Sequence, residues 1–270
     1  MRVLPIVVLL ALAGCGGGTD DHSETVVGAF YPLAWAAEQI AAEGTAVVNL
    51  TPPGAEPHDV ELSPSDVEAV RDARLVIYLG GGFQPAVEDA ASERAGISVD
   101  VLDGEHDPHV WLDPVGFADV VRKIGRALER PDRARLLAEE LMQLDEDYRR
   151  GLRGCQRRTL VTSHAAFGHL AARYDLTQLS LTGVSPEAEP GPRELERLIE
   201  EVRASGATTV FAEPLVSDRV AETVAREAGA ELAVLDPLEG LSDERLAAGD
   251  DYLTSMRTNL ATLRGALGCR

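Results

Sequence analysis

The alternation of short apolar segments with amphipathic segments limits the possible folds of this chain more than any other feature. Both halves of the chain show it, and the short segments are rich in β-branched residues. Eight strands are expected, at 24–30, 46–50, 74–80, 96–102, 158–163, 176–181, 208–213 and 231–237. Short strands that alternate with helices favour parallel sheets covered by helices on both faces. The sequence therefore predicts an α/β protein with mostly parallel sheets.

A long helical tract separates the two halves. Residues 115–153 contain no glycine cluster, and one apolar stripe is formed by Leu137, Leu141, Leu144, Tyr148 and Leu152. The tract is too long for an ordinary connection and too amphipathic for a flexible linker. The sequence therefore predicts an N-terminal lobe (25–114) and a C-terminal lobe (154–270), joined by one long rigid helix.

The first fifteen residues are expected to be a targeting signal. Arg2 precedes an apolar run that is too short for a permanent membrane span. Leu12-Ala13-Gly14-Cys15 resembles the bacterial lipobox, in which the chain is cut before a cysteine that is then acylated. An ordinary secretory signal is the alternative. We expect residues 16–24 to form a flexible tether and the protein to be extracytoplasmic, anchored to the cell membrane through lipid on Cys15.

The net charge and the cysteines limit the possible partners and the cellular compartment of the protein. A formal net charge of −20 argues against a nucleic-acid partner, since a polyanion would be repelled by the surface. With Cys15 acylated, Cys155 and Cys269 remain in an oxidising compartment. A disulfide between them is the natural pairing, and two free thiols are the alternative.

Four side chains with metal-binding chemistry follow expected strands. His58 lies in the loop after the second strand, His109 follows the fourth, His164 directly follows 158–163, and Asp236 closes the last strand. Ligand groups gather at the carboxyl ends of strands in open α/β sheets, so a cleft between two lobes would bring these residues together. Three imidazoles and one carboxylate suit a tetrahedral site for a divalent metal, with Zn²⁺ the leading choice. For each histidine the alternative is a solvated loop residue.

The candidate residues lie in segments that resemble one known family. The segments are GAFYPLAW, EPHDVELSPSD, DPHVWLDP, SHAAFGHLAARYDL, GVSPEAEPGP, VFAEPLVS and AVLDPL, in the family's order over roughly residues 24–268. In these segments the chain is similar to the metal-binding receptors of bacterial zinc and manganese ABC importers. The resemblance implies two α/β lobes joined by one rigid long helix, with the metal between the lobes. It places the ligands on His58, His109, His164 and Asp236.

The resemblance also implies a function. A protein of this kind captures a divalent metal outside the cytoplasm and delivers it to the membrane permease of an ABC importer; we expect it to be a monomer. Manganese receptors tend to carry a carboxylate where this chain has His164, so zinc is favoured. Manganese is the alternative, since some relatives with three histidines and one aspartate take it. Glu213 is expected to accept a hydrogen bond from a ligand histidine, and His169 to lie on a helix near the site.

A zinc-dependent hydrolase is the alternative from a different class. It would need an open coordination position and a general base, for which Glu56, Asp59 and Glu213 are the candidates. Four protein ligands leave no position for a substrate, so we expect the protein not to be an enzyme. Turnover of a model ester by the zinc-loaded protein would favour the hydrolase instead.

Overall fold

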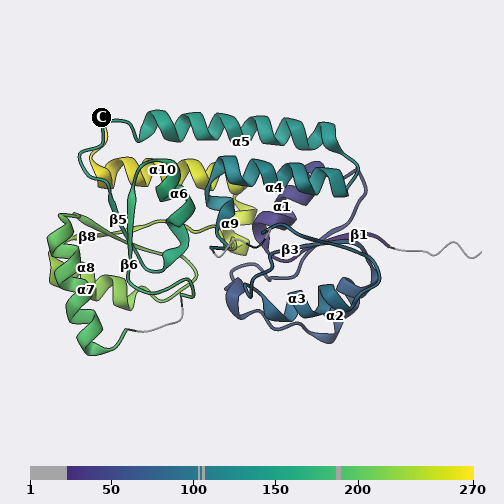
Figure 1. The fold of residues 1–270 in the computed structure, drawn as a ribbon, viewed down its shortest axis with the longest axis horizontal. Coiled ribbons are helices and arrows are strands. Elements are labelled where there is room, and N and C mark those ends of the chain that lie inside the picture. The colour runs from purple at the N-terminus through teal and green to yellow at the C-terminus, as the bar shows by residue number, and fades with distance from the viewer. Residues whose placement is uncertain (1–22, 103, 105–106, 187–189) are drawn as a thin grey trace, which may run out of the picture.

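A computed structural model describes residues 23–102, 104, 107–186 and 190–270 (Figure 1). The expected targeting signal, Cys15 as the expected site of acylation and most of the expected tether lie outside the described residues, as does His106. Within the described ranges, no helix is both long and apolar enough to cross a membrane.

The first lobe contains one parallel four-stranded sheet in the order β2-β1-β3-β4. Its strands are β1 (Ser23–Gly28), β2 (Val47–Asn49), β3 (Ala73–Tyr78) and β4 (Ile97–Asp100). Its helices are α1 (Tyr31–Ile40), α2 (Pro64–Asp72) and α3 (Pro85–Glu93). Figure 1 shows α1 on one face of the sheet and α2 and α3 on the other. Local sequence sets the helix starts: Ser63 and Asp66 form a capping box at α2, with Pro64 at the first helical position.

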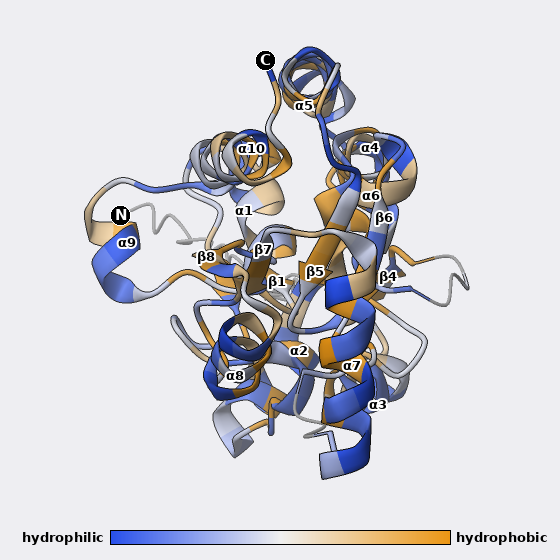
Figure 2. Ribbon diagram, turned by 90° about the vertical axis from the view of Figure 1, so that its left-hand side faces the viewer, coloured by the Kyte–Doolittle hydropathy of each residue, from blue (hydrophilic) through white to orange (hydrophobic). Residues whose placement is uncertain are grey.

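The second lobe repeats this topology with the order β6-β5-β7-β8. Its strands are β5 (Thr159–Thr162), β6 (Thr177–Ser180), β7 (Thr209–Ala212) and β8 (Glu231–Val234). Its helices include α6 (Gly168–Arg173), α7 (Pro192–Ser205) and α8 (Arg219–Ala228). All eight expected strands are therefore present. Seen end on in Figure 2, apolar β5 lies inside the lobe, between α7 and α8 below and the long helices above.

The linking tract contains two helices, α4 (Pro114–Ala127) and α5 (Pro131–Gly151). The chain reverses between them at Glu129, whose φ is +56°, and Pro131 then begins α5. The two helices approach so closely that a Cβ on Gly125 would lie 2.2 Å from the Cβ of Ala134. The second helix is the long connection that the sequence predicts, because α5 extends over both lobes in Figure 1.

The C-terminal segment returns to the first lobe. A single helix is expected near 242–264, but the structure has α9 (Asp243–Ala247) and α10 (Tyr252–Leu267), because Gly249 adopts a φ of +87° and Asp251 caps a new helix. Tyr252 stacks on Trp35 of α1 with ring centroids 4.9 Å apart. One apolar core therefore runs through the first lobe, α5, α10 and part of the second lobe, and it holds the lobes together.

A disulfide joins Cys155 to Cys269, which are 114 residues apart in sequence. It ties the loop before β5 to the chain end beyond α10. The expected pairing of these two cysteines is confirmed.

Candidate metal centre

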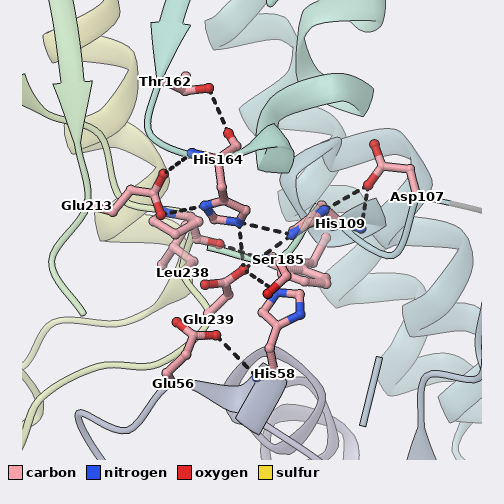
Figure 3. Close-up of polar contacts among 12 residues, drawn as sticks. Glu56, His58, Asp107, His109, Thr162, His164, Ser185, Glu213, Leu238 and Glu239 are labelled. Carbon is pink, nitrogen blue, oxygen red and sulfur yellow. Dashed lines mark hydrogen bonds and ion pairs between the residues drawn. The ribbon is translucent and has the colours of Figure 1, made fainter. Parts of the chain in front are cut away.

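Three histidines and one glutamate converge where the loops of the two lobes meet. His58, His109, His164 and Glu239 each offer one ligand atom, and these atoms all lie within 4.8 Å of one another (Figure 3). His58 lies in a 3₁₀ turn after β2, and His109 follows β4. From the second lobe, His164 follows β5 and Glu239 follows β8. Each lobe therefore supplies two side chains from the carboxyl ends of its strands.

The distances in this cluster match the size of a zinc site. Oε1 of Glu239 lies 3.3 Å from Nε2 of His58 and 3.2 Å from Nε2 of both His109 and His164. The Nε2 atoms of His109 and His164 are 3.3 Å apart. Two ligands about 2.0–2.1 Å from a tetrahedral zinc ion are about 3.3–3.4 Å from each other. The cluster therefore needs little rearrangement to hold an ion of that size.

Carboxylates fix the orientation of two of the imidazoles from behind. Oδ1 of Asp107 lies 2.8 Å from Nδ1 of His109, and Oε2 of Glu213 lies 2.5 Å from Nδ1 of His164. Glu213, which the sequence analysis placed beside a ligand histidine, also accepts the backbone N–H of His164 at 3.0 Å. A proton on Nδ1 leaves Nε2 facing the centre, where it would bind a metal after releasing its own proton, as metal-binding histidines do.

The buried histidines and carboxylates of the cluster stabilise one another's charged forms. Burial alone would lower the pKa of His164, but its hydrogen bonds to Glu213 and Glu239 raise that pKa to about 10. Burial opposes the charged form of His109 too, and hydrogen bonds to Asp107 and Glu239 raise its pKa. Burial would raise the pKa of Glu239, but hydrogen bonds from the three histidines hold it well below its usual range. The negative charge needed to face a cation is therefore stabilised inside the protein.

Asp236 differs from the sequence-based assignment. It is not part of the converging group: Oδ1 accepts the backbone N–H of Leu238 at 2.7 Å, and Oδ2 pairs with Arg245. The chain turns sharply here, with Leu238 at a φ of +57°, and the turn carries Glu239 into the centre instead. Asp236 thus shapes the loop that presents Glu239. An acid three positions downstream in the same loop was the only signal in the sequence for this residue.

Glu56 lies next to the cluster, and its two carboxylate oxygens have different surroundings. Its Oε1 accepts the backbone N–H of His58 at 3.2 Å, while Oε2 is buried and has no hydrogen bond to any described residue. Burial and the nearby charge of Glu239 raise the pKa of Glu56 to about 8. This carboxyl group holds the turn that carries His58.

Comparison with known proteins assigns the chain to a family. Residues 26–266 match the family described as "Zinc-uptake complex component A periplasmic". The chain belongs to this zinc-uptake component A family.

Two relatives of this family member have names that refer to zinc binding. The "Zinc-binding protein AdcA" of Streptococcus pyogenes serotype M1 is 33% identical over 283 residues, which cover 88% of this chain and 55% of that protein. The "Zinc-binding lipoprotein AdcA" of Streptococcus pneumoniae R6 is 31% identical over 298 residues, covering 97% of this chain and 60% of that protein. The chain thus spans little more than half the length of these relatives.

A solved structure agrees with the fold of this family member. The Zn(II)-bound ZnuA-like domain of Streptococcus pneumoniae AdcA superposes with a TM-score of 0.77 at 31% identity. The match covers 90% of this chain and 98% of that domain. The two-lobed α/β architecture expected from the sequence is therefore confirmed.

Residues 107–113 of this family member, which include His109, contact the second lobe on two sides. Trp111 packs beside His109 with ring centroids 5.1 Å apart, and its Nε1 donates to the carbonyl of Pro237 at 2.7 Å. On the other side, Arg173 of α6 makes two hydrogen bonds to Asp113, at 2.8 and 2.6 Å. His169 lies outside the converging group, with its Nε2 3.0 Å from the carbonyl oxygen of Asp107. These contacts do not require a metal. They hold the segment that carries His109 near the segments of the second lobe that carry His164 and Glu239.

Replacing Glu213 by glutamine is expected to weaken zinc binding by about 10–100-fold, because the neutral amide no longer fixes and polarises His164. Competition with a zinc chelator measures the change. Glu222→Gln, which changes an exposed residue of α8, is the matched control and should bind zinc as the unsubstituted protein does. Equal affinities for Glu213→Gln and Glu222→Gln would show that Glu213 does not support the site.

Proposed function

We propose that this protein captures Zn²⁺ outside the cytoplasm and delivers it to the membrane permease of an ABC importer. The observation that carries the proposal is the convergence of His58, His109, His164 and Glu239 from both lobes. Zinc would be held by the three Nε2 atoms and a carboxylate oxygen. All four groups come from one chain, so one copy of the protein would bind one ion.

The ligand chemistry favours zinc over harder ions. Three imidazole nitrogens with a single carboxylate form a tetrahedral set of the kind zinc prefers, whereas manganese prefers more oxygen ligands. The family name and the names of both relatives, which refer to zinc, support the same choice.

The same geometry supports binding without catalysis. A catalytic zinc keeps one position for water or substrate, while four protein ligands fill a tetrahedral shell. The side chains of His109, His164 and Glu239 are at most 1% exposed, so no substrate larger than an ion reaches them. We infer that the ion is cargo and not a cofactor.

The location proposed for the protein follows from its N-terminal sequence. Cys15, at the end of the lipobox-like segment, would carry lipid and hold the folded lobes at the outer side of the cell membrane. The description of one relative as a lipoprotein supports this anchor.

The decisive test compares two carboxylates in the same loop. Glu239→Gln should weaken zinc binding by roughly tenfold to a hundredfold, because an amide oxygen is a neutral and poorer ligand. Asp236→Asn should have the smaller effect, since Asp236 contacts Leu238 and Arg245 and not the centre. Titration of metal-free protein with zinc, with manganese as competitor, gives both affinities. Failure of the unsubstituted protein to prefer zinc over manganese would contradict the proposed cargo.

A further inference from the structure

The four side chains of the centre differ in their access to solvent. Those of His109 and His164 are 0% exposed and that of Glu239 is 1% exposed, while that of His58 is 9% exposed. In Figure 3, His58 lies at the edge of the cluster, below Glu239 and the other two histidines. An ion that approaches from solvent therefore meets His58 before the other three.

A pocket leads from the surface to the His58 side chain. Its volume is about 240 Å³, and its lining includes Phe83 and Pro108 of the first lobe and Val184 and Ser185 of the second. A pocket of this volume has room for several water molecules. Solvent, and a small ion with it, can therefore reach His58 through this pocket.

The inner wall of this pocket is fixed. Phe83 is 4% exposed and packs edge-on against His58, with ring centroids 4.5 Å apart. The rim contains three glycines, 80–82, and a Cβ at Gly82 would meet nothing within 4 Å. Gly81 and Gly82 have φ values of +77° and +86°, so the backbone itself requires glycine here. At these glycine positions the first-lobe side of the pocket thus carries no side chain.

The opposite side of the rim carries Val184, which is 43% exposed. Apart from His58, the described residues that line the pocket are uncharged. The size of the side chain at position 184 therefore affects how open this side of the pocket is.

We propose that zinc enters and leaves the centre through this pocket, past Val184 and Ser185, and that His58 is the first ligand it meets. The inference rests on the proposed function. It assigns to Val184 the control of the rates of zinc exchange, with no role in the affinity.

Substituting Val184 by tryptophan tests this route. Filling the opening should slow zinc uptake and zinc release alike, by about tenfold each, and leave the dissociation constant within about threefold of its original value. Uptake is measured by stopped-flow mixing of metal-free protein with zinc held by a fluorescent chelator. Release is measured by mixing zinc-loaded protein with excess chelator. The smaller Val184→Phe should slow both rates less, and Val184→Ala should exchange zinc at least as fast as the unsubstituted protein.

Val67→Trp is the matched control, because Val67 lies on α2 with 44% exposure and does not line this pocket. It should exchange zinc at the original rates. Original rates in Val184→Trp, or a weaker affinity with an unchanged rate of uptake, would overturn the proposed route. Absence of zinc binding in the unsubstituted protein would instead overturn the proposed function.

Discussion

Replacing His164 by alanine is expected to weaken zinc binding by roughly a hundredfold to a thousandfold. A four-ligand zinc site contributes about 10–16 kcal/mol, or about 2.5–4 kcal/mol for each ligand. The loss of one ligand at this scale corresponds to that range of affinity. His164 is fully buried, and its loss also removes one side-chain partner from Glu213 and one from Glu239. Competition titrations with chelators of graded affinity measure the change.

Two further variants test whether the loss of zinc affinity is specific to the metal centre. His58→Ala removes the most accessible of the four side chains and should give a loss of similar order without opening the buried core. His22→Ala removes a histidine of the expected tether and should bind zinc normally. A loss of less than about threefold in both His164→Ala and His58→Ala would place the zinc elsewhere.

Loss of the disulfide is expected to have the largest effect on stability. Replacing Cys155 and Cys269 by serine frees a loop of more than a hundred residues in the unfolded chain. In the chain-entropy description, closure of a loop of that length stabilises the folded state by about 4–5 kcal/mol. The free energy of unfolding, from urea titrations of metal-free protein, should fall by that amount.

Reduction of the unsubstituted protein provides the control for this measurement. Dithiothreitol should lower its stability towards that of the double serine variant and leave the variant unchanged. A difference below about 1 kcal/mol between oxidised protein and variant would mean that the bridge does not restrict the unfolded chain in this way.

Much of the fold follows from local sequence. Six strands lie within the expected ranges and β1 and β3 begin one residue earlier, because β-branched runs and turn residues mark the strands along the chain. Proline at the first helical position and the capping box at Ser63 mark helix starts in the same local way. The position of the histidines after strand ends was enough to bring His58, His109 and His164 together.

The fourth member of the centre could not be settled by the same reasoning. Asp236 and Glu239 lie three residues apart in one loop, and both are carboxylates at the end of β8. The backbone turn at Leu238 and the ion pair of Asp236 with Arg245 decide which one faces the centre. The turn depends on a φ value that leucine rarely adopts, and the ion pair depends on how the loop folds back on itself, which the residue pattern does not show.

The sequence also does not predict that the C-terminal helices return to the first lobe. Tyr252 packs on Trp35 and donates a hydrogen bond to the carbonyl of Trp111 at 2.5 Å, across more than 140 residues. Periodicity shows that α10 is amphipathic but does not identify the surface it covers. The shared core makes the lobes one unit, although the chain reads as two repeats of the same α/β pattern.

The most direct test of the proposed centre is a crystal structure of the zinc-loaded protein with anomalous scattering recorded on both sides of the zinc absorption edge. We expect one strong zinc peak per chain, about 2.0–2.2 Å from Nε2 of His58, His109 and His164 and from a carboxylate oxygen of Glu239. A zinc peak bound to Asp236 with Glu239 turned away, or a peak outside this group of residues, would contradict it.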